Sequence, residues 1–282
     1  MNKPLLICTD LDRTLLPNGA QPESPQARSL FSRIAQRKEV DLAYVTGRHL
    51  QLVQDAITEY ELPQPDYILS DVGTSIYLNL EGHWKLWQDW LDEIAPCWNN
   101  YQHHQLAAKF SDIAELQLQE DVKQNQYKLS YYVSLDVDHQ ALIQVMQHRC
   151  TQLGIDASLV WSIDEATHIG LLDLIPAIAT KLHAIEYLIK HKQYRIDTTL
   201  FAGDSGNDLA VLSSRILSVV VANASDNIKQ QSISLSQAHA NTSAIYIAQG
   251  NFMDMNGNYS AGILEGLAHY FPETLDWMQE SH

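Results

Sequence analysis

Basic residues are scarce in this chain of 282 residues. Lysine and arginine number 18 against 34 aspartates and glutamates, which gives a formal net charge of −16 at pH 7. A phosphate backbone or an anionic membrane surface would be repelled by that charge, so we expect no nucleic acid and no membrane as partners. An enzyme for an anionic substrate would need a cation and a few local lysines or arginines to offset the same field.

Cysteine is rare and long apolar runs are missing. The three cysteines, Cys8, Cys97 and Cys150, are widely spaced and form no metal-ligand pattern, which favours reduced thiols over crosslinks. No apolar run approaches the roughly 20 residues that a membrane helix requires, and no basic and then apolar leader opens the sequence. We therefore expect a cytoplasmic protein, and its 45% hydrophobic content suits one large or two modest domains.

Strand-like and helix-like patterns alternate at both ends of the chain. Strands that alternate with amphipathic helices are typical of βαβ units and predict a parallel sheet. The expected strands are residues 5–9, 40–45, 67–69, 170–175, 199–202 and 217–221. The expected helices are residues 24–38, 49–60 and 179–191.

From about residue 81 to residue 165 the alternation gives way to a different pattern. A helical stretch holds Trp84, Trp87 and Trp90 at a spacing of three, and polar strands and a further helix follow it. Packing within a small core is the favoured role of these tryptophans, with stacking on sugar rings as the alternative. The sequence thus predicts an α/β fold, with a Rossmann-like parallel-sheet core (1–80 and 166–282) and an inserted α+β domain (81–165).

Two acidic clusters follow expected strands. Asp10 and Asp12 come directly after the first strand, and acids at i and i+2 on an extended segment point the same way. Asp204 and Asp208 follow a later strand. Open α/β sheets place ligands at the carboxyl ends of their strands, so the clusters can converge on one hard cation. The alternative is that these are solvated loop acids or helix caps.

The residue types near these acids suit phosphoryl or acyl transfer. An aspartyl intermediate needs a nucleophile and a general acid and base, roles that Asp10 and Asp12 can fill. At the end of another strand, Thr46, Gly47 and Arg48 offer a hydroxyl, a backbone N–H and a guanidinium to phosphate oxygens. The same three residues also suit a plain turn.

Two further places offer binding groups. Lys181 lies early in a helix, where the dipole disfavours a cation, which indicates a partner elsewhere, although lysine is also a good helix former. Lys128, Ser130 and Tyr132 alternate along one strand of the insert and so share a face. That face suits contacts to a sugar as well as a solvated surface.

The order of these motifs resembles the haloacid dehalogenase superfamily of aspartate-dependent phosphatases. That superfamily carries an Asp-x-Asp-x-Thr strand end, a later Thr or Ser, a Lys and a Gly-Asp-x-x-x-Asp cluster, in that sequence. The matching residues are Asp10, Asp12, Thr14, Thr46, Lys181, Gly203, Asp204 and Asp208. The resemblance covers nearly the whole chain, and the insert resembles the α+β cap of the sugar phosphatase branch.

Within that branch, segments 42–48, 128–131, 203–208 and 260–265 are most similar to bacterial sucrose-phosphate phosphatases. This likeness implies that Asp10 attacks the phosphorus of a sugar phosphate, with sucrose 6-phosphate as the first expectation. Asp12 would protonate the leaving oxygen and then activate water. Mg²⁺ would be held by Asp10, the Asp12 carbonyl and Asp204, with Asp208 anchoring its outer shell.

The resemblance also implies which residues bind the substrate. As catalytic residues, Thr46 and Lys181 would clamp phosphate oxygens. Further phosphate contacts are expected from Thr14, Gly47 and Asn207. Sugar contacts are expected from Arg48, Lys128, Ser130, Tyr132 and Asn223. A sucrose-phosphate synthase would be the functional partner.

Two features depart from the family pattern. Arg13 stands where the family often has a small or neutral residue, and it either touches the substrate or points outward. Residues 164–170 do not match the family segment at the sugar site, which leaves the choice of sugar open. Mannosylfructose, trehalose and hexose phosphates are therefore alternative substrates. A phosphomutase, which returns the phosphoryl group to sugar, and a non-catalytic phosphosugar-binding domain are the alternatives from other classes.

Overall fold

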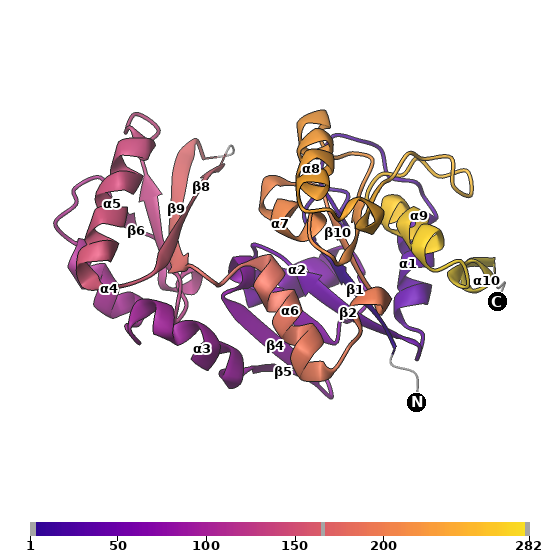
Figure 1. Cartoon of the computed structure of the whole chain (residues 1–282), viewed down its shortest axis with the longest axis horizontal. Helices are drawn as coiled ribbons and strands as arrows, with labels where there is room; N and C mark the ends of the chain where they lie inside the picture. The colour runs from indigo at the N-terminus through magenta and orange to yellow at the C-terminus, as the bar shows by residue number, and fades with distance from the viewer. Residues whose placement is uncertain (1–3, 165–166, 280–282) are drawn as a thin grey trace. The chain divides into compact units, whose positions relative to one another are not determined.

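The computed structural model describes residues 4–164 and 167–279, which divide into two compact units (Figure 1). The described residues up to Leu86 and from Lys181 onward form the core unit, and those within Trp87–Thr180 form the cap unit. The three cysteines are free thiols, as expected. None of the helices within the described ranges combines the length and the apolar character that a membrane span needs.

One sheet organises the described part of the core unit. Its eight strands are β1 (Leu5–Thr9), β2 (Val40–Val45), β3 (Tyr67–Ser70), β4 (Ser75–Leu80), β5 (His83–Leu86), β10 (Thr199–Gly203), β11 (Leu217–Val220) and β12 (Ile245–Ile247). They lie in the order β12-β11-β10-β1-β2-β3-β4-β5. The strands from β12 to β3 run parallel, whereas β4 and β5 add an antiparallel edge. The predicted α/β class with a parallel-sheet core is confirmed.

Helices cover both faces of this sheet. In the described part of the core unit they are α1 (Ala27–Ala35), α2 (Leu50–Glu59), α6 (Lys181–Lys192), α7 (Leu209–Leu212), α8 (Asp226–Ala238), α9 (Ser260–Tyr270) and α10 (Thr274–Gln279). Leu5 and Ile7 of β1 belong to one hydrophobic core with buried residues of α1, α2 and α9. Because side chains alternate across a strand, the buried Leu6 and Cys8 point to the opposite face. Buried Leu188 of α6 lies outside the first core, and α6 packs against β3 and α7.

The described part of the cap unit has its own antiparallel sheet. Its four strands are β6 (Gln117–Leu118), β7 (Leu129–Val133), β8 (Ala157–Asp164) and β9 (Ile169–Pro176), in the order β6-β7-β9-β8. Its helices are α3 (Gln88–Ile94), α4 (His103–Phe110) and α5 (His139–Leu153). Trp90 and Trp98 are fully buried, which matches the expected packing role of Trp90. At the start of α5, Asp138 accepts hydrogen bonds from two backbone amides and caps the helix.

Strand pairing corrects three expectations. Residues 170–175, expected in the parallel core sheet, lie in β9 and pair antiparallel with β7 and β8. The insert therefore extends to Thr180 instead of ending at 165, and it starts at Trp87 instead of 81 because β5 pairs with β4. Trp84 lies on β5 and shares no helix with Trp90. An apolar run indicates burial, but the partner of a strand depends on residues far away in the sequence.

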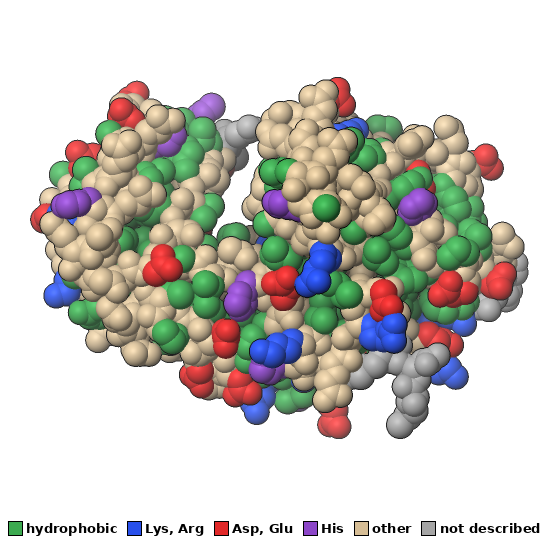
Figure 2. All heavy atoms as spheres, viewed as in Figure 1, with side chains coloured by type: hydrophobic (Ala, Val, Ile, Leu, Met, Phe, Trp, Pro, Cys, Tyr) green, Lys and Arg blue, Asp and Glu red, His purple; other side chains and the backbone are tan. Residues whose placement is uncertain are grey.

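The surface drawn in Figure 2 carries acidic side chains at many separate places, with fewer lysines and arginines between them. On this face the acidic side chains are therefore spread out and not gathered in one patch. The net charge of −16 repels anions, so a site for a phosphorylated ligand must supply its own cations.

Candidate active site

Three neighbouring strands end at one place on the core sheet. Because β10, β1 and β2 are adjacent and parallel, Asp204, Asp10 and Thr46, which follow them, lie at the same edge. The Asp10 amide donates to the Ala202 carbonyl at 2.9 Å and continues the strand pairing. Carboxylate oxygens of Asp10, Asp204 and Asp208 lie within 4.8 Å of one another. The structure thus brings together the two acidic clusters.

Lys181 links the two clusters. It is the first residue of α6, and its ammonium lies 3.0 Å from Asp10 Oδ2 and 2.8 Å from Asp208 Oδ1. All three side chains are buried. In such surroundings a charge is tolerated only when it is paired, so each carboxylate depends on the lysine. These are the partners that the position of Lys181 near a helix start indicated.

Asp208 holds the loop after β10 in shape. Its Oδ2 accepts hydrogen bonds from the Asp204 and Ser205 amides at 3.1 and 3.0 Å, and from the Ser205 hydroxyl at 3.0 Å. Its Oδ1 accepts one from Lys181. Gly203 permits this close packing, because a Cβ there would lie 2.7 Å from Asp208 Cγ. With both oxygens engaged, Asp208 suits an anchoring role better than direct contact with a ligand.

Burial disfavours ionisation of the other two carboxyl groups. It raises the pKa of Asp204 to about 6, with the charge of Asp208 adding to the shift and the Thr14 hydrogen bond opposing it. Burial also raises the pKa of Asp10 to about 8, against the opposing charge of Lys181. When all three carboxylates are ionised, the buried Lys181 offsets one of the three charges, and the half-exposed Arg13 makes a single 3.5 Å ion pair with Asp204. An oxygen-ligated divalent cation matches the negative charge that remains, so these residues fit a metal such as Mg²⁺.

Asp12 lies in a different environment. Its side chain is 44% exposed, and Arg48 donates to both carboxylate oxygens, from Nη2 at 2.7 Å and from Nε at 2.9 Å. Burial alone would raise the pKa of Asp12, but the hydrogen bonds and charge of Arg48 outweigh it and hold the pKa below its usual range. Arg48, expected to bind sugar, therefore orients Asp12 and keeps it ionised.

The site residues surround a cavity of about 360 Å³ in the core unit. Its lining includes Asp10, Asp12, Gly47, Arg48, Asp204 and Asn207. Thr46 is buried beside it, and the Thr46 hydroxyl accepts a hydrogen bond from the Arg48 amide at 3.2 Å. Of the predicted phosphate-binding residues, Gly47 and Asn207 are thus placed where a ligand can reach them.

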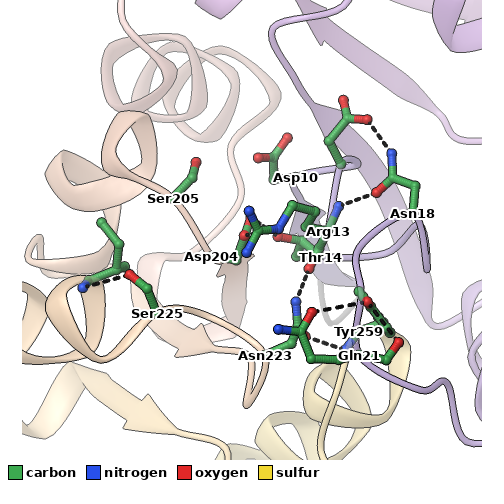
Figure 3. Close-up of polar contacts among 12 residues, drawn as sticks. Asp10, Arg13, Thr14, Asn18, Gln21, Asp204, Ser205, Asn223, Ser225 and Tyr259 are labelled. Atoms are coloured by element: carbon green, nitrogen blue, oxygen red, sulfur yellow. Dashed lines mark hydrogen bonds and ion pairs between the residues drawn. The ribbon is translucent and has the colours of Figure 1, made fainter. Parts of the chain in front are cut away.

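Thr14 and Asn223 are outside that lining and support other residues of the site. The Thr14 hydroxyl donates to Asp204 Oδ1 at 3.1 Å. Asn223 Nδ2 donates to the Arg13 carbonyl at 2.6 Å, and its Oδ1 accepts the Tyr259 amide at 2.8 Å (Figure 3). Both side chains position other residues of the site, and the contacts with phosphate and sugar that were expected of them stay predictions.

Sequence reasoning leaves Arg13 undecided and gives Asn18 no role. Arg13 lines the cavity, and its Nε lies 3.5 Å from Asp204 Oδ2. Asn18 Oδ1 accepts the Arg13 amide at 2.8 Å, and its Nδ2 donates to Asp12 Oδ1 at 2.7 Å. The turn signal at residues 17–19 could have indicated this role of Asn18, because asparagine side chains in turns form hydrogen bonds with nearby backbone groups.

Ser130 and Tyr132 lie on β7 and share one face of it, as their alternation predicts, and Lys128 directly precedes this strand. Lys128 Nζ and Ser130 Oγ both donate to the Lys123 carbonyl, at 3.1 and 3.3 Å. Lys123 Nζ donates to the Tyr132 hydroxyl at 2.6 Å. These contacts lie within the cap unit, and a role of this face in sugar binding stays a prediction.

Comparison with known proteins decides the family. A model of the sucrose-6F-phosphate phosphohydrolase family matches residues 3–271, which is nearly the whole chain. The chain belongs to this family. As the order of the motifs predicts, it is a phosphatase-type member of the haloacid dehalogenase (HAD) superfamily.

Relatives of this sucrose-phosphatase family member include proteins with different names. One from Nitrosococcus oceani, named as a HAD-like hydrolase, is 50% identical over 280 residues, which are 99% of this chain and 75% of that protein. The mannosylfructose-phosphate phosphatase of Agrobacterium fabrum is 27% identical over 270 residues, 95% of this chain and 98% of that protein. The solved Synechocystis sucrose-phosphatase, in complex with sucrose and phosphate, is 27% identical with a TM-score of 0.72, covering 95% of this chain and 98% of that one.

Proposed function

We propose that this chain is a Mg²⁺-dependent phosphatase that hydrolyses sucrose 6-phosphate to sucrose and phosphate. The observation that carries the proposal is the buried group of Asp10, Lys181 and Asp208 beside Asp204, at a cavity that Asp10 and Asp204 line. The family and the likeness to a sucrose-phosphatase that binds sucrose and phosphate support the choice of sugar.

The metal would be held by Asp10, Asp204 and the backbone carbonyl of Asp12. When bound, it offsets the negative charge on the transferring phosphoryl group. Asp208 would remain behind these ligands, because its oxygens are engaged by Lys181 and by the loop amides.

Asp10 would begin the reaction as the nucleophile. One of its carboxylate oxygens forms a bond to phosphorus while the bond from phosphorus to the sugar oxygen breaks. Asp12 gives a proton to the departing sugar oxygen. Thr46 and Lys181 hold phosphate oxygens, and Lys181 also reduces the repulsion between the phosphate and Asp10. The sugar leaves, and the phosphoryl group remains on Asp10.

Asp12 would then act as a base. It removes a proton from water, the water oxygen bonds to phosphorus, and the bond between phosphorus and Asp10 breaks. Inorganic phosphate leaves, and Asp12 carries its proton again. The pair of hydrogen bonds from Arg48 favours the ionised Asp12 that this second step uses and opposes the protonated Asp12 that the first step uses.

The test is phosphate release from sucrose 6-phosphate beside mannosylfructose, trehalose, glucose and mannose phosphates, with Mg²⁺ and with chelator. Asp10→Asn is the blank and should lose activity by about 10⁴-fold or more while remaining folded. Preference for sucrose 6-phosphate supports the proposal. Preference for the mannosylfructose phosphate, the substrate in the name of the Agrobacterium relative, would keep the mechanism and change the sugar. Activity that survives chelation or Asp10→Asn contradicts the mechanism, and a requirement for a bisphosphate activator would indicate a mutase.

A further inference from the structure

The cations around the cavity differ in how fully their N–H donors are used. Lys181 is buried between two carboxylates. Arg48 donates from Nε and Nη2 to Asp12 and from Nη1 to the Leu52 carbonyl at 3.3 Å. Two of the three N–H donors of Lys181 thus have partners within the protein, which leaves one for a phosphate oxygen, and every nitrogen of the Arg48 guanidinium has a protein partner.

Arg13 is much less committed to protein partners. Its side chain is half exposed and lines the cavity, and its Nε makes one long ion pair of 3.5 Å with Asp204 Oδ2. A guanidinium carries five N–H donors in a flat fork. Within the described residues, no protein acceptor lies within hydrogen-bond distance of its Nη atoms. These donors are left for a ligand of the cavity.

Hydrogen bonds with two side chains hold the backbone of Arg13 in place. Its φ of 59° lies in the left-handed region, which residues other than glycine rarely adopt. Asn18 accepts its amide and Asn223 donates to its carbonyl, and Asn223 is itself held by the Tyr259 amide (Figure 3). Two asparagines far apart in the sequence thus determine where the Arg13 side chain leaves the backbone. Strained residues that are held this firmly are typical of functional sites.

We propose that Arg13 binds the phosphate group of the substrate and that Asn18 and Asn223 position it for this contact. The assignment rests on the proposed function. A flat guanidinium suits two oxygens of one phosphate, and such charge-assisted pairs are stronger than the long contact with Asp204. In a chain with a net charge of −16, one more cation at the cavity also lowers the repulsion that a phosphate meets.

The experiment is calorimetric titration of inorganic phosphate into the full chain in the presence of Mg²⁺. Arg13→Asn should weaken phosphate binding by about tenfold or more. Arg13→Lys keeps the charge but loses the paired N–H donors of the guanidinium, so its phosphate affinity should lie between those of the wild type and Arg13→Asn. The matched control is Arg195→Asn, since Arg195 is exposed, pairs with Asp197 and lies outside the lining of this cavity. Phosphate affinity should be unchanged in that variant.

Two further variants separate binding from folding. Arg13→Gly suits the positive φ, so it should melt no lower than the wild type while it binds phosphate as weakly as Arg13→Asn. Asn223→Ala should also weaken phosphate binding, because the turn that aims Arg13 is released. Mg²⁺ affinity should not fall in Arg13→Asn, because the change removes a cation that pairs with Asp204.

Phosphate affinity of Arg13→Asn within about twofold of the wild type would overturn the assignment. An equal loss in Arg195→Asn would overturn it too, since the effect would then come from overall charge. If the wild-type protein binds phosphate but hydrolyses no sugar phosphate, the proposed function is wrong. The titration would still show whether Arg13 binds phosphate, because it measures phosphate affinity and not hydrolysis.

Discussion

Asp10 and Asp12 follow the same strand with one residue between them, yet they lie in opposite environments. Asp10 is buried against the equally buried Lys181, and burial raises its pKa to about 8. Asp12 is partly exposed, and the hydrogen bonds and charge of Arg48 outweigh burial and lower its pKa. Titratable groups whose environments push their pKa values apart are suited to different chemical roles. The lowered pKa favours the form of Asp12 that acts as a base, whereas Asp10 depends on the charge of Lys181 and on a bound cation for the ionised form that a nucleophile needs.

The comparison also separates stability from chemistry. On the buried side, a charge left without its partner cannot reach water, so losing a partner there should destabilise the fold. On the exposed side, water replaces a lost partner, so losing Arg48 should alter catalysis and leave folding nearly unchanged. Three changes test this division.

Removing the buried cation should have the largest effect. Lys181→Met leaves Asp10 and Asp208 buried without a counter-charge, so the free energy of unfolding should fall by about 3–5 kcal/mol. Urea denaturation without Mg²⁺ measures it. The double variant Lys181→Met/Asp208→Asn should recover part of the lost stability, because it removes one of the two buried carboxylates that no longer have a counter-charge. A single variant as stable as the wild type would contradict the buried ion-pair account.

Removing Arg48, whose side chain is 24% exposed, should affect the pH profile. In Arg48→Gln the pKa of Asp12 should rise, because the hydrogen bonds and charge that lower it are gone. The dephosphorylation step needs ionised Asp12, so the acidic limb of kcat should move to higher pH where that step limits the rate. Stability should change by about 1 kcal/mol or less. The control is Arg28→Gln, because Arg28 pairs with Glu23 and neither residue lines the cavity. If the acidic limb stays in place in Arg48→Gln, Arg48 does not lower the pKa of Asp12.

The smallest effect concerns pH and metal. Burial raises the pKa of Asp204 to about 6 and that of Asp10 to about 8, so ionising them costs stability that the metal-free protein loses as pH rises from about 4 to 8. Mg²⁺ binds the ionised carboxylates, so its stabilising effect should grow over the same interval. Melting with and without Mg²⁺ should give a shift of a few degrees at pH 8 and almost none at pH 5. A shift independent of pH would show that these carboxyl groups do not hold the ion.

Much of the site could be predicted from where acidic and hydroxyl residues follow buried strands. Strand ends of a parallel sheet share one edge, so the acidic clusters at Asp10 and Asp204 were expected to converge, and their carboxylate oxygens lie within 4.8 Å of one another. The place of Lys181 near a helix start hinted at a partner elsewhere, the resemblance to the superfamily gave its role, and the structure shows its two partners. Each local signal was weak by itself, and the order of the motifs together with the geometry of a parallel sheet made the prediction specific.

Other features depend on contacts that no local pattern records. The strand at 170–175 is as apolar as a core strand, and only its pairing with β7 and β8 places it in the cap unit. Asn223 acts on the backbone of Arg13, 210 residues away, through an amide that could equally serve a turn. The sequence does not show that Arg48 donates to both carboxylate oxygens of Asp12, because these residues lie 36 positions apart, and its predicted contact with sugar stays a prediction.

The most direct test of the central claim is to trap the phosphoryl group on Asp10. In Asp12→Asn, Asp10 should still accept the phosphoryl group from p-nitrophenyl phosphate, because nitrophenolate departs without a proton. Hydrolysis of the phosphoaspartate should then be slow, because no base activates the water. Mass spectrometry after acid quench should find one phosphoryl group on the Asp10 peptide, and none after the further change Asp10→Asn. Steady release of nitrophenol by Asp12→Asn with no covalent phosphoryl group at any time would contradict the account.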